Sequence, residues 1–479
     1  MCTSRANRRP FSLPCDRDPV AGRNRVPDRD PAYDEVDAGL LEPVRAGTPV
    51  EAATSDAAYL RALLDVEAAL ARAQARIGLI PAEAAAAIEA GTRGTFDPVD
   101  LARRARGAGN PVVPLVQDLQ AAVRAVDPAA ADHVHLGATS QDIVDSATML
   151  VAARALDSTL SDLARTAAAL ADLAERHRDT LQAGRTLTQH AVPTTFGLVA
   201  AGWCVAVTDA WAHTRAVRAA LPAQLGGAAG TLAALGPHGI ALLAPFAEEL
   251  GLAEAVLPWH TLRAPILDLA GASVRITGAL GKFAGDVALL GQTEVGEVAE
   301  ATGAGHGGSS AMPHKHNPVL SVLIVSAARQ VPGYASILAA SAAGAEYQRP
   351  AGAWHAEWQP LRAALRLAGG AASTAAELAE GLVVFPERMR ANLELTGGRI
   401  VSERLVAELT AEYGATQARR LLTDASRTSA RTGRHLRDVL GEADETLFDP
   451  AGHLGSAPAL IDRALAHHRT VFRFPEKVT

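Results

Sequence analysis

The sequence predicts an all-α fold, and two features of the chain support this fold class. Alanine supplies much of the apolar content of the 479 residues, whereas aromatic residues make up only 4%. Residues 138–183 contain neither glycine nor proline. Alanine and leucine favour helices, and a helix of about 40 residues is roughly 60 Å long because each residue adds ~1.5 Å. We therefore expect an elongated bundle of long helices.

The N-terminal part divides into an arm and a helical domain. Residues 1–31 are rich in arginine, proline and aspartate with little apolar periodicity, which is typical of a disordered extension. A helical pattern begins at Asp56, and Asp97 followed by Pro98 marks a second helix start. We assign residues 32–130 to an N-terminal helical domain.

The rest of the chain divides into a central bundle, residues 131–382, and a small C-terminal helical domain, residues 383–479. Five long stretches supply the helices of the bundle: 138–183, 194–220, 268–300, 318–343 and 356–381. Glycines break the last hundred residues into shorter helices. Long helices leave apolar faces that one subunit cannot cover, so we expect a homo-oligomer.

Composition and charge exclude several function classes. A net charge of -7 gives no reason to expect nucleic acid or an anionic membrane as a partner. The three cysteines lack the spacing of a zinc site or a disulfide framework, which favours a reducing, cytoplasmic location. The uncharged residues 191–208 contain Pro193 and end at Asp209, so we expect a buried helix there and no membrane span. The N-terminus lacks the apolar core of a signal peptide.

A glycine-rich stretch, GGAAGTLAALG at 226–236, lacks the preceding strand that a dinucleotide-binding fold requires. We interpret it as a tight bend between helices.

The run GSSAMPHKHNPV at 308–319 follows the glycine-rich TGAGHGG. It combines two hydroxyls, a cation and an amide (Ser309, Ser310, Lys315 and Asn317) on a segment punctuated by glycine and proline. Such residues predict a loop that closes over a carboxylate and transfers protons.

A second stretch, HVHLGATSQDIVDSA at 133–147, places Thr139, Ser140 and Gln141 at the start of the long glycine-free helix. Exposed amides and the positive end of the helix dipole favour a bound carboxylate there, with these side chains as extra donors. A well-capped helix is the structural alternative. The nearby histidines lack a third ligand cluster, so we expect no metal.

A third stretch, GRTLTQHAVPTTFG at 184–197, also leads into a helix start, and His190 lies just ahead of it. A helix N-terminus favours neutral imidazole, which suits a proton shuttle. A histidine that only packs the bundle is the alternative.

Together, the three stretches resemble the fumarase/aspartase superfamily, and the resemblance covers the chain from about residue 33 onward. It implies a three-domain all-α subunit, a homotetramer with each site built from three subunits, and no metal or organic cofactor. It implies that Ser309, with Ser310 beside it, exchanges the proton on the carbon next to a carboxylate. We expect substrate binding by a set of residues from the first and third stretches: Thr139, Ser140, Gln141, Ser310, Lys315 and Asn317. Arg329, downstream of the loop on the same helix, is a weaker candidate for a second carboxylate contact.

Leu187 separates this chain from fumarase and adenylosuccinate lyase, which resemble the third stretch but carry a histidine there. Bacterial carboxymuconate cycloisomerases carry a bulky apolar residue at that position, and they also resemble GATSQD at 137–142 and GAWHAEWQP at 352–360. This branch implies intramolecular addition of a carboxylate across a carbon–carbon double bond, converting the tricarboxylate 3-carboxy-cis,cis-muconate to a lactone in protocatechuate degradation. A carboxyl group, with a pKa of about 4, needs little acid assistance.

Three points stay open. His190 is a participant without an assigned role, and the patch Trp354–Trp358 lines either the pocket or a subunit seam. Another superfamily lyase, adenylosuccinate lyase first, is the nearest alternative function. A non-catalytic structural protein is an alternative of a different class, although such a protein needs none of Ser309, Lys315 and Asn317.

Overall fold

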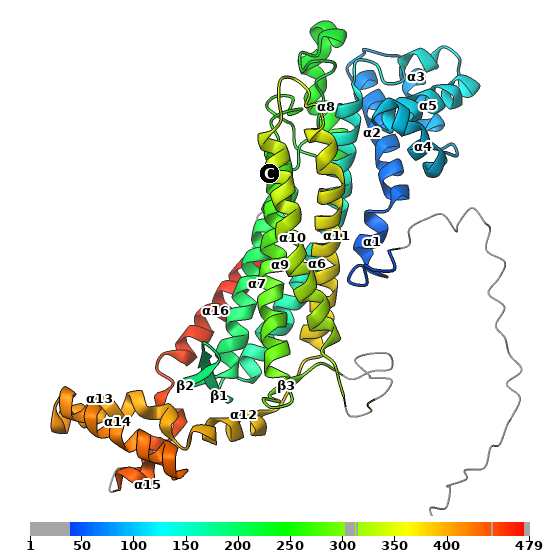
Figure 1. Cartoon of the computed structure of the whole chain (residues 1–479). Helices are drawn as coiled ribbons and strands as arrows, with labels where there is room; N and C mark the ends of the chain where they lie inside the picture. The colour runs from blue at the N-terminus through cyan, green and yellow to red at the C-terminus, as the bar shows by residue number, and fades with distance from the viewer. Residues whose placement is uncertain (1–38, 302–311, 313–314, 442–443, 474–479) are drawn as a thin grey trace, which may run out of the picture. The chain divides into compact units, whose positions relative to one another are not determined.

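Helices dominate the computed structural model, which describes residues 39–301, 312, 315–441 and 444–473 (Figure 1). The described residues contain sixteen α-helices and two two-stranded antiparallel sheets, so the predicted all-α class is confirmed. The predicted arm, residues 1–31, lies outside the described residues. Every element below belongs to one compact unit, residues 42–479.

The N-terminal helices begin where capping residues predict them. Ser55 accepts a hydrogen bond from the Ala58 amide at the start of α2, and Asp97 accepts one from the Val99 amide at the start of α4. This part of the chain contains α1 (Pro49–Ala53), α2 (Asp56–Arg76), α3 (Ala82–Gly91), α4 (Pro98–Ala108), α5 (Val112–Val126) and the 3₁₀ turn η2 (Ala130–His133).

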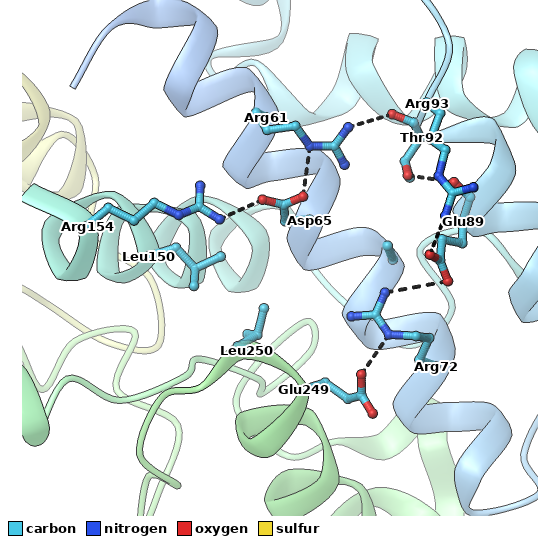
Figure 2. A pocket seen from close by; sticks show the side chains of 11 residues that line it. Arg61, Asp65, Arg72, Glu89, Thr92, Arg93, Leu150, Arg154, Glu249 and Leu250 are labelled. Atoms are coloured by element: carbon cyan, nitrogen blue, oxygen red, sulfur yellow. Dashed lines mark hydrogen bonds and ion pairs between the residues drawn. The ribbon is translucent and has the colours of Figure 1, made fainter. Parts of the chain in front are cut away.

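Ion pairs tie α2 to the long helix α6 (Ser140–Arg176) around a surface cavity of about 330 Å³. In Figure 2, Asp65 lies between Arg61 and Arg154, at 2.8 and 2.7 Å. Arg72 pairs with Glu249 at 2.6 Å on the far wall. The guanidinium groups of this cavity are already matched by carboxylates, so we interpret it as a brace between helices.

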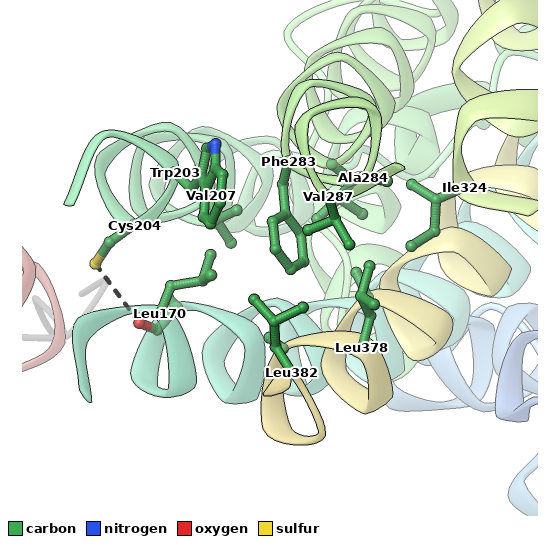
Figure 3. Close-up of a cluster of buried hydrophobic side chains, with 14 of the residues drawn as sticks. Leu170, Trp203, Cys204, Val207, Phe283, Ala284, Val287, Ile324, Leu378 and Leu382 are labelled. Carbon is green, nitrogen blue, oxygen red and sulfur yellow. Dashed lines mark hydrogen bonds between the residues drawn. The ribbon is translucent and has the colours of Figure 1, made fainter. Parts of the chain in front are cut away.

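The central bundle consists of α6, α7 (Phe196–Ala219), α9 (Ala264–Leu290), α10 (Val319–Ala343) and α11 (Ala353–Glu380). Their apolar faces meet in one core, in which Trp203, Phe283 and Ile324 are buried (Figure 3). Burial of such side chains contributes about 1.5–3 kcal/mol each. A helix was predicted over residues 268–300, but α9 ends sooner, at Leu290.

Small residues let these helices approach closely, which is why an alanine-rich chain folds this way. A Cβ atom on Gly281 of α9 would lie 2.5 Å from the Ala328 Cβ of α10. Residues 196–208, the bulk of the uncharged stretch, form the buried first half of α7, as predicted. Of the described helices, α10 is long and apolar enough to cross a membrane; it packs on α9 and α11.

The uncovered face of α10 carries Val322 and Ile337, which are 57% and 45% exposed. Only 22% of the most apolar 18-residue stretch of α10 is buried. A surface of this kind is typical of an interface between subunits.

The remaining elements connect the ends of the bundle. They comprise η3 (Ala233–His238), α8 (Gly239–Leu250), and the strands β1 (Leu181–Thr186), β2 (Gln189–Thr195), β3 (Val298–Ala299) and β4 (Val383–Val384). β1 pairs with β2, and β3 with β4.

The C-terminal part is a series of short helices, as the glycines predict. It comprises α12 (Pro386–Leu393), η4 (Glu394–Thr396), η5 (Arg399–Val401), α13 (Ser402–Tyr413), α14 (Ala415–Thr432), α15 (Leu436–Leu440), η6 (Glu445–Phe448), η7 (Pro450–His453) and α16 (Ala457–Arg473). Gly414 and Gly433 adopt positive φ at helix ends. The last helix, α16, packs against α7 of the bundle.

Candidate active site

The first motif forms the N-terminus of α6. Thr139 is the N-cap, and its amide donates to the Asp142 carboxylate at 2.9 Å, as a capping box requires. Thr139 and Ser140 are half-buried. Gln141 is fully buried, and its amide group donates to the His260 carbonyl at 2.9 Å. Thr139 and Ser140 are therefore partly accessible at the helix start, whereas Gln141 is buried and holds the helix start through its hydrogen bond to His260.

Asp142 joins this helix start to the glycine stretch. Its buried carboxylate also accepts the amides of Gly226 and Gly227, both at 2.9 Å, and contacts the His260 ring at 2.7 Å. The glycine stretch is the predicted bend between helices, since it lies between α7 and α8 and its last residues form the first part of η3. In addition, it lies beside the first motif, a contact that sequence analysis missed.

Asp142 is expected to be essential for stability because its removal leaves three amides without their acceptor. We expect Asp142→Ala to lower the free energy of unfolding by about 3 kcal/mol, measured by urea denaturation at fixed protein concentration. The control is Asp172→Ala, which removes one partner of the exposed pair with Arg176 and should change stability by less than about 1 kcal/mol. Equal stability of the two variants would contradict this role.

Arg349 supplies a cation to the first motif, and sequence analysis missed it. Its guanidinium donates to Thr139 Oγ1 at 2.9 Å and to the Ala228 carbonyl at 3.1 Å. The side chain is exposed and follows the C-terminus of α10. No sequence signal pairs it with Thr139, which lies 210 positions away.

His135 lies just ahead of the same helix. Its backbone is left-handed, with φ of 62°, which is uncommon for a residue other than glycine. Its ring contacts buried Glu67 at 2.7 Å. Burial lowers the pKa of His135, but the charge and hydrogen bond of Glu67, with Asp142, outweigh it, so the pKa is raised. The strained backbone is typical of a functional region.

The second motif forms the hairpin β1–β2 ahead of α7. Leu187 and Thr188 occupy its two-residue turn with φ of 48° and 68°, as a type I′ turn requires. Leu187 lies at the tip and is 96% exposed. Pro193 lies within β2, not in the first turn of the helix, and Thr195 is the N-cap of α7.

His190 is placed by this hairpin, opposite Arg185. Its buried Nδ1 has no hydrogen-bond partner. Burial lowers the pKa of His190, Arg185 lowers it further, and Glu297 partly opposes both effects. The predicted preference for neutral imidazole is therefore supported, but burial and a cation cause it, because His190 lies in a strand and not at a helix start.

The third motif is described only in part. Ser309 and Ser310 lie outside the described residues. Lys315 is exposed, Asn317 is half-buried just ahead of α10, and Arg329 is exposed further along that helix. Glu300 accepts the Ser321 amide at 2.8 Å and the Leu320 amide at 3.1 Å. Glu300 therefore caps α10. Because Glu300 precedes the motif and its two donors follow it, these hydrogen bonds hold the two ends of the motif close together.

The motifs lie at two ends of the bundle. The first begins α6 and the second follows its end, so the 37 residues of α6 separate them by roughly 55 Å. The segment before the third motif lies at the hairpin end, because Arg185 pairs with Glu297 at 2.6 Å. One copy of the chain cannot bring the first two motifs onto one small substrate.

Two residues of the tryptophan patch, Glu357 and Trp358, line a second cavity of about 540 Å³. Trp354 donates to Asp145 at 3.0 Å and packs edge-on against Trp358, which lines the cavity. Buried Arg263 joins Asp145 to Glu357. Neither this cavity nor the one in Figure 2 is lined by Thr139, His190 or Lys315. Across the described ranges, no three His, Cys, Asp or Glu side chains are grouped for a metal.

Comparisons with known proteins identify the family of this chain. A family model described as lyase matches residues 46–333. A nitrosuccinate lyase from Streptomyces davaonensis is 57% identical over 90% of this chain and 95% of its own. A 3-carboxy-cis,cis-muconate cycloisomerase from Pseudomonas aeruginosa is 47% identical over 90% and 97%. The crystal structure of a 3-carboxy-cis,cis-muconate lactonizing enzyme from Pseudomonas putida matches with a TM-score of 0.85 and 38% identity over 90% and 99%.

The family model covers more than half of the chain, and both relatives span nearly its full length. The motifs at the two ends of the bundle fall within the matched region. The chain therefore belongs to the lyase family and is an enzyme of the fumarase/aspartase superfamily.

Proposed function

We propose that the enzyme eliminates nitrite from nitrosuccinate and so produces an unsaturated four-carbon dicarboxylate. The identity of 57% to the nitrosuccinate lyase, against 47% to the cycloisomerase, carries this choice. In the reaction, one carbon next to a carboxylate loses a proton, the carbon–nitrogen bond breaks, and the bonding electrons leave with nitrite.

Leu187 suits this reaction for the reason that led us to expect a cycloisomerase. Nitrite, like a carboxylate, is the anion of an acid that is ionised at neutral pH, so its departure needs no proton donor. A leaving hydroxide or amine would need one. An exposed leucine at the hairpin tip therefore favours a weakly basic leaving group and argues against adenylosuccinate lyase.

The described residues suggest a role for each motif. Thr139, Ser140 and Arg349 would bind one substrate carboxylate at the start of α6, where the helix dipole adds to the charge of the guanidinium. Lys315 and Asn317 would bind the other carboxylate, on which charge builds when Ser309 removes the proton. No metal or organic cofactor is needed for these steps.

The length of α6 supports an oligomeric enzyme. Because roughly 55 Å separates the first two motifs, a complete site requires other copies of the chain. The exposed apolar face of α10 offers an interface for them. We propose a homotetramer with each site formed by several subunits.

The cycloisomerase reaction is the second candidate, favoured by the 47% identity and the TM-score of 0.85. The deciding experiment incubates the purified protein with nitrosuccinate, 3-carboxy-cis,cis-muconate and adenylosuccinate in parallel. Nitrite release is measured colorimetrically, and diene loss by ultraviolet absorbance. Nitrite release without diene loss supports the first candidate, diene loss alone supports the second, and cleavage of adenylosuccinate alone would overturn both.

Arg349 should contribute to substrate binding in either reaction. We expect Arg349→Ala to lower kcat/KM by roughly tenfold to a hundredfold, because a charge-assisted hydrogen bond contributes about 1.5–3 kcal/mol. Most of the loss should be an increase in KM. The control, Arg176→Ala, removes an exposed arginine near the far end of α6. An unchanged KM in Arg349→Ala would exclude a role for Arg349 in binding.

A further inference from the structure

Glu297 is a buried carboxylate that the proposed reaction does not use. Its side chain is 0% exposed, and both oxygens are fully occupied. Oε1 accepts from Arg185 at 2.6 Å and from Asn392 at 2.7 Å, while Oε2 accepts from Gln182 at 2.8 Å and from Arg185 at 3.0 Å. A buried charge persists in a protein only when it is paired in this way.

These contacts link three segments that are distant in sequence. Gln182 and Arg185 belong to β1, Asn392 belongs to α12, and Glu297 lies directly before β3. Arg185 binds through two parallel hydrogen bonds, which fix the guanidinium plane as well as its distance. The hairpin is therefore attached to the segment that precedes the third motif.

The same ion pair lies beside His190. Arg185 is the cross-strand neighbour of His190 in the hairpin. The other elements that pack on β2 include η5, η7 and α7, and α7 carries no charged residue before Asp209. The charged residues of η5 and η7 have partners of their own: Arg399 of η5 donates to Ser429, and His453 of η7 contacts Glu403. The charges that act on the pKa of His190 are thus those of Arg185 and Glu297.

We propose that Glu297 is a positioning residue that acts through Arg185. The pair holds the hairpin that carries His190 in place and balances the charge beside its ring. The proposal rests on the proposed function only in taking His190 as a participant in the reaction. The attachment of the hairpin and the balance of charge are independent of the substrate.

The first test measures the titration of His190 without any substrate. Exchange of the imidazole C2 hydrogen for deuterium depends on the protonation state, and mass spectrometry reads it in a large protein. Residues 178–212 contain His190 as their sole histidine, so one peptide reports it.

The two single variants should shift this titration in opposite directions. Glu297→Gln leaves the cation of Arg185 unbalanced and should lower the pKa of His190. Arg185→Gln leaves the carboxylate unbalanced and should raise it. The double variant leaves no unpaired buried charge, so its His190 pKa should return toward the wild-type value. Shifts in the same direction, or no shift, would overturn the proposal, because a merely structural pair gives no such sign reversal.

The second test measures kinetics on the substrate that the enzyme turns over. We expect Glu297→Gln to lower kcat/KM by about a hundredfold through misplacement of the hairpin, with the acid limb of the pH profile moved in the direction of the His190 shift. The control is Asp286→Asn, which removes a carboxylate that accepts from Trp203 at 2.7 Å and pairs with Lys282, neither of which belongs to the motifs.

The control should lose stability but keep the wild-type pH profile. If Glu297→Gln shifts the titration but leaves kcat/KM and the profile unchanged, the positioning role is excluded. If the wild-type protein turns over none of the substrates, the proposed function is excluded. The titration of His190 would still test the effect of Glu297, because it needs no substrate.

Discussion

Ser309→Ala is expected to lower kcat by roughly a thousandfold, because general base catalysis contributes about 10²–10⁴-fold to rate. A serine is a weak base in water, so its loss matters only if the surrounding site stabilises the alkoxide. The measurement is nitrite release and diene loss under saturating substrate, with KM determined beside it. KM should change little, since the proposed role of the serine is to remove a proton and not to bind the carboxylates.

Ser310→Ala is the matched control for this variant because it removes an identical group from the next position. It should retain far more activity than Ser309→Ala. Assembly is checked by light scattering for both variants. If Ser310→Ala carries the large loss instead, the assignment of the two serines is reversed. If neither variant loses activity, the proton is removed by another group.

Two impaired variants are expected to restore activity when mixed. Activity is measured as kcat/KM, because Arg349→Ala acts mainly on KM. Chains with Arg349→Ala have a damaged first motif and chains with Ser309→Ala a damaged third motif, so a mixed oligomer contains some sites with both motifs intact. Equal random mixing of two chains gives about a quarter of sites intact when the two motifs come from different subunits. The mixture is unfolded in urea, refolded together and assayed.

Separate refolding of the two variants before mixing provides the control, and it should give no recovery. A chain that carries both substitutions should also fail to complement Arg349→Ala. Activity that stays at the sum of the two variants after joint refolding would contradict a site shared between subunits.

The sequence contains the signals for the long helices and for the cap of α6. A run without glycine or proline predicted one long helix, and α6 fills most of it, Ser140–Arg176. Thr139 and Asp142 predicted a cap, and their backbone-to-carboxylate bond is present. These features depend on neighbours within one turn, where sequence patterns are informative.

Features that depend on distant contacts were missed. The hairpin turn at Leu187 and Thr188 has no glycine or asparagine to signal positive φ, so the segment was taken for the approach to a helix. Arg349 reaches Thr139, and Glu297 reaches Arg185, across 210 and 112 positions. No local pattern encodes such pairs. These pairs became visible only in the three-dimensional structure.

The length of α6 also has a consequence for how the enzyme behaves in a cell. If one chain holds only separated parts of a site, a newly made subunit is inert until it meets others. Assembly then follows mass action, so activity rises more steeply than the amount of protein at low expression and proportionally once assembly is complete. A defective copy made beside a normal one would disable sites that it shares with its neighbours.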